Sequence, residues 1–344
     1  MLAKQWLCFL IPLTFVACDD VVVDERSSTG GDSTTSSGSG STGNGSPFCA
    51  TGAARTKIGK SYGSATEGIV SDGSWVYWVY ENGAVWRAGP ANAAPEAMVE
   101  GIGDLLRTIA IDTDAVYVVD YSKALYRIDK GSLGVKTIAT GSFAAVAADG
   151  QRVYVTQPDG VYAMENQGGP LQLLAAIDGA DSVAVDAADV YVRSVGTVAD
   201  KTARVVRVPK AGGEAVDIAK KASLAYHYFS QEIAVDATHV YWVHSSAGTL
   251  SRALKSGGGE EILADGLADP VSVAIDDAFV YFTLRGKDGG SLEDRAVAKV
   301  PKAGGAITYI AKGADVSAFG VAVDGTNAYW TQAVTDGLVE TACK

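Results

Sequence analysis

The chain has 344 residues, of which 47% are hydrophobic, and a formal net charge of −12. This length is enough for one large or two ordinary domains with a sizeable core. Asp and Glu number 40 against 28 Lys and Arg, and nothing concentrates positive charge, which excludes nucleic acid and an anionic membrane surface as partners.

The first 17 residues are predicted to be an export signal. Lys4 supplies a positive charge, and Trp6 to Val16 is an apolar stretch too short to span a bilayer as a mature helix. In "TFVAC", small Ala17 stands directly before Cys18, which resembles the lipobox of bacterial lipoproteins, although Phe15 stands where Leu is commonest. The resemblance implies that Cys18 is lipidated and becomes the new N-terminus. An ordinary secretory signal that is cleaved nearby is the alternative.

Residues 18–48 are predicted to be the lipidated N-terminus followed by a flexible tether. From Ser27 to Ser46 the chain contains no hydrophobic residue, so this stretch cannot bury apolar surface. A lipid anchor needs such a spacer. We therefore expect the protein in the bacterial cell envelope, held by its lipid alone, with the outer membrane or cell surface favoured over the inner membrane.

After the tether, an aspartate followed five residues later by a tyrosine recurs seven times. Successive copies begin 40, 37, 37, 50, 40 and 48 residues apart, close to the length of one four-stranded propeller blade. The copies are Asp72/Tyr77, Asp112/Tyr117, Asp149/Tyr154, Asp186/Tyr191, Asp236/Tyr241, Asp276/Tyr281 and Asp324/Tyr329.

Each copy reads as four short strands. An apolar strand such as "SVAV" precedes the aspartate, and a second strand such as "VYWV" carries the tyrosine. A third strand such as "RVVRV" often carries a basic residue, and a Gly-rich turn leads to the fourth. We therefore predict an all-β fold for residues 49–344: a seven-bladed β-propeller with four antiparallel strands in each blade.

The repeated aspartate and tyrosine are given structural roles. The carboxylate can accept hydrogen bonds from the backbone N–H groups of a tight turn, and the tyrosine places a large surface between neighbouring blades. No copy has the dense Asp and Asn spacing of a calcium loop. The three histidines lack a matched Cys or carboxylate spacing, so we expect neither a bound metal nor a cofactor.

The last copy lacks a fourth strand before the chain reaches Lys344. "TKIGK" at Thr56–Lys60 reads like "TYIAK" at Thr308–Lys312, so the N-terminal strand is predicted to complete the seventh blade and close the ring. Cys49 and Cys343 lie at the two ends of the folded region of a chain that we expect to be exported. We predict a disulfide between them across this junction, with two free thiols as the alternative.

The whole pattern resembles the β-propeller repeats of bacterial envelope lipoproteins. "VYW" and "AYWT" are also similar to the YWTD-type repeats of receptor propellers and to TolB-like propellers, which usually have six blades instead of the seven counted here. The resemblance implies the fold and leaves the function to residues that do not repeat.

Three insertions are predicted to lie on one face of the propeller, the face of the second-to-third strand connections and the blade-to-blade connections. They are Arg193–Ala203, Ser223–Gln231 and Leu284–Arg295. Binding residues occur disproportionately on such loops over a rigid scaffold. The tether should enter at the opposite face, so we expect the loops to point away from the membrane.

The candidate binding residues lie on or beside these insertions. They are Tyr226, His227, Tyr228, Phe229, His244, Arg285, Lys287 and Asp288. The aromatic cluster could stack on a sugar ring or on an apolar side chain of a partner. A loop that only packs over the channel mouth, and charged residues that are only solvated, are the alternatives.

The sequence contains no recognised catalytic motif, such as a nucleophile elbow, a phosphate loop or His-Glu-x-x-His. It therefore predicts a monomeric, non-enzymatic envelope lipoprotein that binds a protein, peptide or glycan. One alternative is a propeller hydrolase or lyase that acts on polysaccharide, with His227 or His244 in acid–base roles. Another is a structural surface protein without a discrete ligand.

Overall fold

The computed structural model describes residues 55–59, 66–89, 94–121, 123–197, 202–222, 233–287, 290–332 and 338–344. All of them belong to the compact unit Asn44–Lys344. The predicted signal peptide and tether, Cys18 and Cys49 lie outside the described residues. Within the described ranges, no helix is long and apolar enough to cross a membrane.

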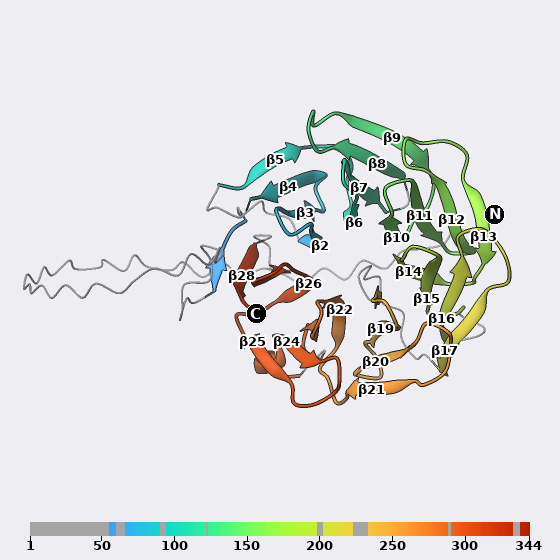
Figure 1. Cartoon of the computed structure of the whole chain (residues 1–344). Helices are drawn as coiled ribbons and strands as arrows, with labels where there is room; N and C mark the ends of the chain where they lie inside the picture. Colours follow the sequence, from blue (N-terminus) through green and yellow to red (C-terminus); the bar gives the residue numbers. More distant parts are fainter. Residues whose placement is uncertain are drawn as a thin grey trace, which may run out of the picture. The chain divides into compact units, whose positions relative to one another are not determined.

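The described residues form seven four-stranded antiparallel sheets arranged in a ring, as predicted (Figure 1). Blade one comprises β2 (Thr66–Ser71), β3 (Val76–Tyr80), β4 (Ala84–Ala88) and β5 (Glu96–Val99); blade two comprises β6 (Leu106–Ile111), β7 (Ala115–Asp120), β8 (Ala124–Asp129) and β9 (Val135–Thr140). Blade three comprises β10 (Ala145–Ala148), β11 (Arg152–Gln157), β12 (Gly160–Glu165) and β13 (Gln172–Ala176); blade four comprises β14 (Ala180–Val185), β15 (Asp189–Ser194), β16 (Thr202–Pro209) and β17 (Val216–Ala222). Blade five comprises β18 (Ile233–Val235), β19 (His239–His244), β20 (Thr249–Leu254) and β21 (Glu261–Ala264); blade six comprises β22 (Pro270–Ile275), β23 (Phe279–Leu284), β24 (Ala296–Pro301) and β25 (Thr308–Lys312). Blade seven comprises β26 (Ala318–Val323), β27 (Asn327–Gln332), β28 (Val339–Cys343) and β1 (Thr56–Lys57).

The ring closes at blade seven as the sequence predicts. The N-terminal strand β1 pairs antiparallel with β28, with Thr56 opposite Thr341 and Lys57 opposite Glu340. Ile58 is 8% exposed and packs in a core cluster with Trp78 of blade one and Val339 of blade seven. The two ends of the propeller domain are therefore joined in one sheet, which leaves no open blade.

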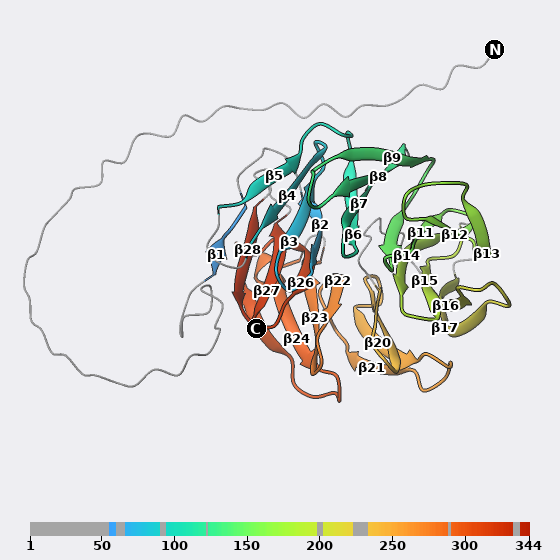
Figure 2. The same cartoon turned by 45° about the horizontal axis from the view of Figure 1, so that its top comes forward.

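The hydrophobic core lies between blades. Within each blade the strands succeed one another outward from the channel, and Figure 2 shows neighbouring sheets standing side by side around the ring. The second strands are buried on both faces; all five residues of β3, for example, are buried. All seven repeat tyrosines are at most 4% exposed, which confirms the packing role predicted for them.

The turn aspartate uses its two carboxylate oxygens for different purposes in every blade. Its Oδ1 accepts the backbone N–H groups two and three residues later, at 2.7–3.0 Å, which confirms the predicted Asx-turn. Its Oδ2 accepts the hydroxyl of the repeat tyrosine at 2.6–3.0 Å, a bond that the sequence analysis did not predict. The constant five-residue interval is the spacing that lets one carboxylate reach both partners.

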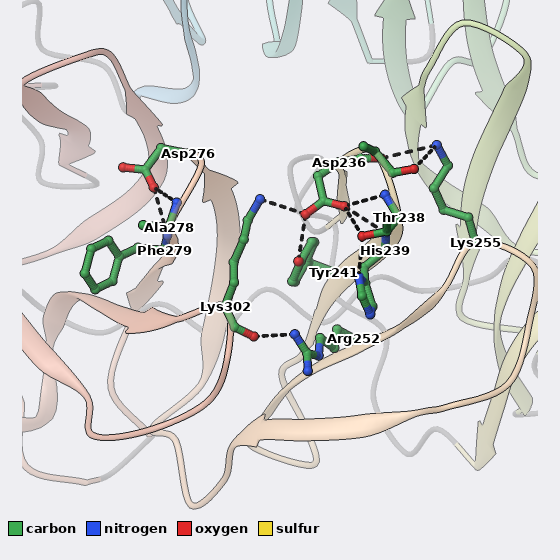
Figure 3. A network of polar contacts seen from close by, with 11 residues as sticks. Asp236, Thr238, His239, Tyr241, Arg252, Lys255, Asp276, Ala278, Phe279 and Lys302 are labelled. Atoms are coloured by element: carbon green, nitrogen blue, oxygen red, sulfur yellow. Dashed lines mark hydrogen bonds and ion pairs between the residues drawn. The ribbon is translucent and has the colours of Figure 1, made fainter.

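At five junctions between blades, a lysine of the following blade joins this pair. Its ammonium meets Oδ2 of the aspartate and lies over the tyrosine ring, with its Nζ 4.9–5.6 Å from the ring centroid. The pairs are Lys130–Asp72, Lys210–Asp149, Lys255–Asp186, Lys302–Asp236 and Lys344–Asp276. Figure 3 shows one of them, where Lys302 of blade six reaches Asp236 and Tyr241 of blade five. We call this arrangement the interblade clamp.

The clamp lowers the pKa of the turn carboxyl. Burial alone would raise the pKa of Asp149, but the hydrogen bond from Lys210 and the backbone N–H groups of Arg152 and Gln151 outweigh it and lower that pKa to about 2. Asp186, clamped by Lys255, also has a pKa of about 2 for the same reasons. The charged form of each carboxyl therefore stabilises the ring.

We expect Lys210→Met to lower the free energy of unfolding at pH 7 by roughly 2 kcal/mol, the range of hydrogen bonds to charged groups. An unfolded Asp has a pKa of about 3.9, whereas folded Asp149 titrates near 2. The wild-type contribution is therefore complete above about pH 4 and is lost as the pH falls from about 4 to about 2. Urea unfolding at pH 7 and across pH 2–5 measures both effects. The exposed Lys57→Met variant is the control, and equal stability of the two variants at pH 7 would contradict the clamp.

The predicted Cys49–Cys343 disulfide remains a prediction, because Cys49 lies outside the described residues. Cys343 ends β28, beside the junction that β1 closes. We expect peptide mapping under non-reducing conditions to recover the two cysteines in one linked peptide, which reduction separates. Recovery of both as free thiols would contradict the pairing.

Candidate binding site at the channel mouth

The described strands that flank the three insertions leave and enter at one face, which we call the long-loop face, while Ser223–Gln231 itself lies outside the described residues. Arg193–Ala203 spans the β15–β16 connection, Ser223–Gln231 lies between β17 and β18, and Leu284–Arg295 spans the β23–β24 connection. The last contains the short 3₁₀-helix η1 (Leu292–Asp294), whose N-cap Ser291 accepts the N–H of Glu293. Their predicted place in the topology is therefore confirmed. The seven turn aspartates lie on the opposite face, which we call the aspartate face.

The aromatic residues of the predicted binding site lie outside the residues that the structure describes. Tyr226, His227, Tyr228, Phe229 and Asp288 all lie outside the described residues. Their contribution to binding therefore remains a prediction from the sequence.

His244 is largely buried at the end of β19. The residue is 7% exposed, and its Nδ1 accepts the backbone N–H of Ala247 at 3.1 Å. With Arg193 and Trp242 it lines a cavity of about 20 Å³ between blades four and five, room for about one water molecule. The described contacts give His244 a role in holding the turn that follows its strand.

Arg285 and Lys287 lie on blade six, after β23. The Arg285 Nε is 2.6 Å from Oδ2 of Asp269, which precedes β22 in the same blade, whereas Lys287 is exposed. Arg285 thus links the entry of the blade to its second-to-third strand connection, and Lys287 is available to a partner. These two residues and His244 occupy neighbouring blades of the same face.

A set of charged residues that the sequence analysis missed lies at the long-loop end of the channel. Five residues before the turn aspartate, at the start of the innermost strand, six blades carry Glu67, Arg107, Ala144, Asp181, Val271 and Phe319, and the corresponding Gln231 of blade five lies outside the described residues. The strand register shifts around this position in blades one, two, four, six and seven, which marks a β-bulge whether the residue there is charged or apolar. Bulges re-aim side chains and are over-represented beside active sites. The varied composition of this position was the available sequence signal.

Glu67 and Arg107 meet across the junction of blades one and two. The Arg107 Nε lies 3.6 Å from the Glu67 Oε2, its second guanidinium nitrogen lies 3.4 Å from Glu81, and its guanidinium carbon lies 5.8 Å from the Tyr121 ring centroid. The Glu67 side chain is only 12% exposed. Burial raises its pKa to about 7, against the lowering effect of Arg107 and with a further rise from Glu81. This carboxyl therefore changes charge near neutral pH.

A second buried pair lies in blade four. Asp181 and Arg193 are 2.5 Å apart, and their side chains are 11% and 7% exposed. Burial raises the pKa of Asp181, and the charge and hydrogen bond of Arg193 oppose the rise. Arg193 also lines the small cavity beside His244, at the base of two of the insertions.

The channel itself is lined differently from its mouth. A cavity of about 340 Å³ is surrounded by seven β-branched residues, each three before its turn aspartate: Ile69, Ile109, Val146, Val183, Ile233, Val273 and Val321. Each innermost strand pairs on one side only, so its other edge presents backbone N–H and C=O groups to the channel. Such groups require water or a polar partner, which makes the channel a poor site for a purely apolar ligand.

The described ranges contain no group of three or more His, Cys, Asp or Glu side chains placed to hold a metal ion. The polar groups that the described residues offer at the long-loop face include carboxylates and guanidinium groups. Glu67 could in addition exchange a proton near neutral pH.

Comparisons with known proteins support the fold and go no further. No family model matches the chain, and no curated protein sequence matches it. A solved streptogramin B lyase is similar in structure, with a TM-score of 0.64 and 9% identity over 85% of this chain and 98% of that one. YCF48 bound to D1 peptide has a TM-score of 0.59 and 10% identity over 85% and 96%. A chain of the nidogen/laminin complex has a TM-score of 0.55 and 15% identity over 72% and 97%. At these identities the likeness shows a β-propeller.

We expect Glu67→Gln to match the wild type in stability near pH 4 and to be more stable at pH 8. An unfolded Glu has a pKa of about 4.3, whereas folded Glu67 titrates near 7. As the pH rises from about 4 to 7, the unfolded chain therefore releases a proton that the folded chain retains, and the wild type loses stability that the Gln variant keeps. Denaturant unfolding at both pH values measures this. Glu100→Gln, an exposed change on the same face, is the control, and a Glu67→Gln variant less stable than the wild type at pH 8 would contradict the assignment.

Proposed function

We propose that this chain is a lipid-anchored, non-enzymatic binding scaffold of the bacterial cell envelope. Its propeller takes a protein, peptide or glycan on the long-loop face. The membrane holds it through the lipid on Cys18 alone, and the tether lets the propeller meet its partner as a monomer.

The observation that carries the proposal is that the insertions and charged residues which interrupt the repeat are found on one face of the propeller. The aspartate face is built from near-identical turns, whereas the long-loop face carries all three insertions and the charged bulge residues Glu67, Arg107 and Asp181. Loops over a rigid scaffold are the usual location of binding residues. Arg107, beside Tyr121 and two carboxylates, combines the side-chain types that dominate interface energetics.

The anchor and the cellular location rest on the N-terminal sequence. "TFVAC" followed by a tract without hydrophobic residues supports a lipidated cysteine on a spacer. Two of the similar propellers were solved with a peptide or protein partner, which supports binding as the function.

A polysaccharide hydrolase or lyase is the second candidate. One similar propeller is a lyase, and the raised pKa of Glu67, about 7, suits general acid–base chemistry near neutral pH. Glu67 would then take the role that the sequence analysis gave to His227 or His244.

The test is quantitative capture from native membranes with the anchored protein as bait. We expect one variant with Tyr226, His227, Tyr228 and Phe229 changed to Ala, and a second with Arg107→Ala, to reduce recovery of the wild-type partner at least about tenfold. Asp277→Ala changes an exposed residue of the aspartate face and should leave recovery unchanged. Thermal unfolding of each variant separates lost binding from lost folding.

Unchanged recovery with both folded long-loop variants would contradict binding at this face. Turnover of a polysaccharide panel by the purified protein, abolished by Glu67→Gln, would replace the scaffold proposal with the enzymatic one.

A further inference from the structure

The interblade clamp is incomplete between blades two and three. Each clamp lysine stands three residues after the third-strand residue that pairs with the repeat tyrosine of its blade. In blade three that residue is Ala163, so the place of the lysine is occupied by Asn166. The Asn166 amide donates to the carbonyl of Gly150 in its own blade at 2.7 Å, so it does not replace the lysine. The aspartate that would receive the lysine is Asp112 of blade two.

Asp112 nevertheless keeps the geometry of a clamp. Its Oδ1 accepts the N–H groups of Asp114 and Ala115, both at 2.8 Å, and its Oδ2 accepts the Tyr117 hydroxyl at 2.7 Å. Among the described residues, no Lys or Arg forms an ion pair with Asp112. Thr113 and Asp114 beside it are exposed, so the group can be reached from solvent.

The seventh junction, between blades seven and one, lacks a lysine for a different reason and is compensated. The corresponding place holds Pro90, which lies outside the described residues. There, Asn327 of the same blade donates to the Tyr329 hydroxyl at 3.2 Å and lies 3.5 Å from Oδ2 of Asp324. Blade two has Ala115 at the position of Asn327, so Asp112 receives no such substitute.

The guanidinium group of Arg127, opposite Tyr117, has one nitrogen without an acceptor in the described part of the chain, although another of its nitrogens lies 3.7 Å from Oδ2 of Asp129. The Arg127 side chain is 11% exposed, and its buried Nε has no hydrogen-bond acceptor among the described residues. At the corresponding positions the Nε of Arg87 donates to Glu96 and that of Arg252 donates to Glu261, whereas the buried Nε of Arg207 in blade four also lacks an acceptor among the described residues. In blade two, Lys136 stands opposite Arg127 and offers no acceptor. The site therefore combines an acceptor for a cation with a donor that needs a carbonyl or carboxylate oxygen.

We propose that Asp112 and Tyr117 form a socket on the aspartate face for the lysine side chain of a partner protein. Five copies of the same aspartate and tyrosine in this ring each hold a lysine ammonium, so the chemistry that the pair selects is already present in the molecule. Arg127 favours a lysine within a peptide over a free amine, because at two occupied clamps the corresponding arginines, Arg87 and Arg252, donate to the main-chain carbonyl of the clamp lysine. The socket is independent of the function proposed for the long-loop face.

The socket is tested on the full chain by NMR of ¹³C-labelled tyrosine. The probes are the peptide acetyl-Gly-Gly-Lys-Gly-Gly-amide, the same peptide with Nε-acetyl-lysine, and n-butylamine. We expect the lysine peptide to shift the Tyr117 resonance, while the tyrosines of the five occupied clamps serve as internal controls. The acetylated peptide and n-butylamine should bind at least about tenfold more weakly, which corresponds to the loss of one modest polar contact.

Asn166→Lys is the matched variant, because it supplies the missing lysine from within the chain. We expect it to abolish the peptide-induced shift and to raise the Tm. Asp112→Asn should also abolish the shift, and since the Asn166→Lys variant should be the more stable protein, the test survives if Asp112→Asn does not fold. An unchanged shift in Asn166→Lys, equal binding of the acetylated peptide or of n-butylamine, or no Tyr117 shift at saturating peptide would overturn the proposal.

Discussion

The propeller depends on how one carboxylate is shared. In every blade the turn aspartate closes the first hairpin with one oxygen and holds the tyrosine hydroxyl with the other. The tyrosine ring is buried between blades, so its only polar atom is satisfied without water. In five junctions the same oxygen also receives a lysine from the next blade. A local turn, a core aromatic and a contact between blades are thus fixed together, and a ring of short strands acquires a common geometry.

The sequence predicts the parts of this arrangement that are local. The turn, the tyrosine and the number of blades follow from a five-residue interval repeated seven times, and the closing strand follows from the likeness of "TKIGK" to "TYIAK". The sequence did not predict the clamp, because its lysine and aspartate are far apart in the chain. In the four pairs joined by a hydrogen bond the separation is 58–68 residues, for example 61 residues for Lys210 and Asp149. No propensity or turn rule relates residues at such a separation. A signal was present nonetheless, since "RIDK", "RVPK", "RALK" and "KVPK" each place a lysine directly after the third strand.

The candidate site was predicted only in outline. The choice of face followed from loop lengths, which sequence reports well, and the structure confirms where the insertions enter the topology. The roles of individual residues did not follow. His244 reads as an accessible histidine after a strand, but burial and its bond to Ala247 assign it to the turn. Glu67 and Arg107 were missed because each reads as one polar residue beside an apolar strand. Their meeting depends on the packing of two blades, and Glu81 and Tyr121 add contacts from further along the chain.

The charged pairs at the channel mouth are not required by the fold. At the same position of the repeat, blade six has Val271, which is 1% exposed, and blade seven has Phe319, so an apolar residue fits the bulge. Burying an ion pair removes two charges from water, and replacing such a pair by apolar residues is often neutral or stabilising. Glu67 shows that cost directly, because its raised pKa means that the folded protein disfavours the charged form. We therefore expect the pairs at Glu67 and Asp181 to add little to the stability of the ring, which is consistent with the recognition role that we propose for the long-loop face.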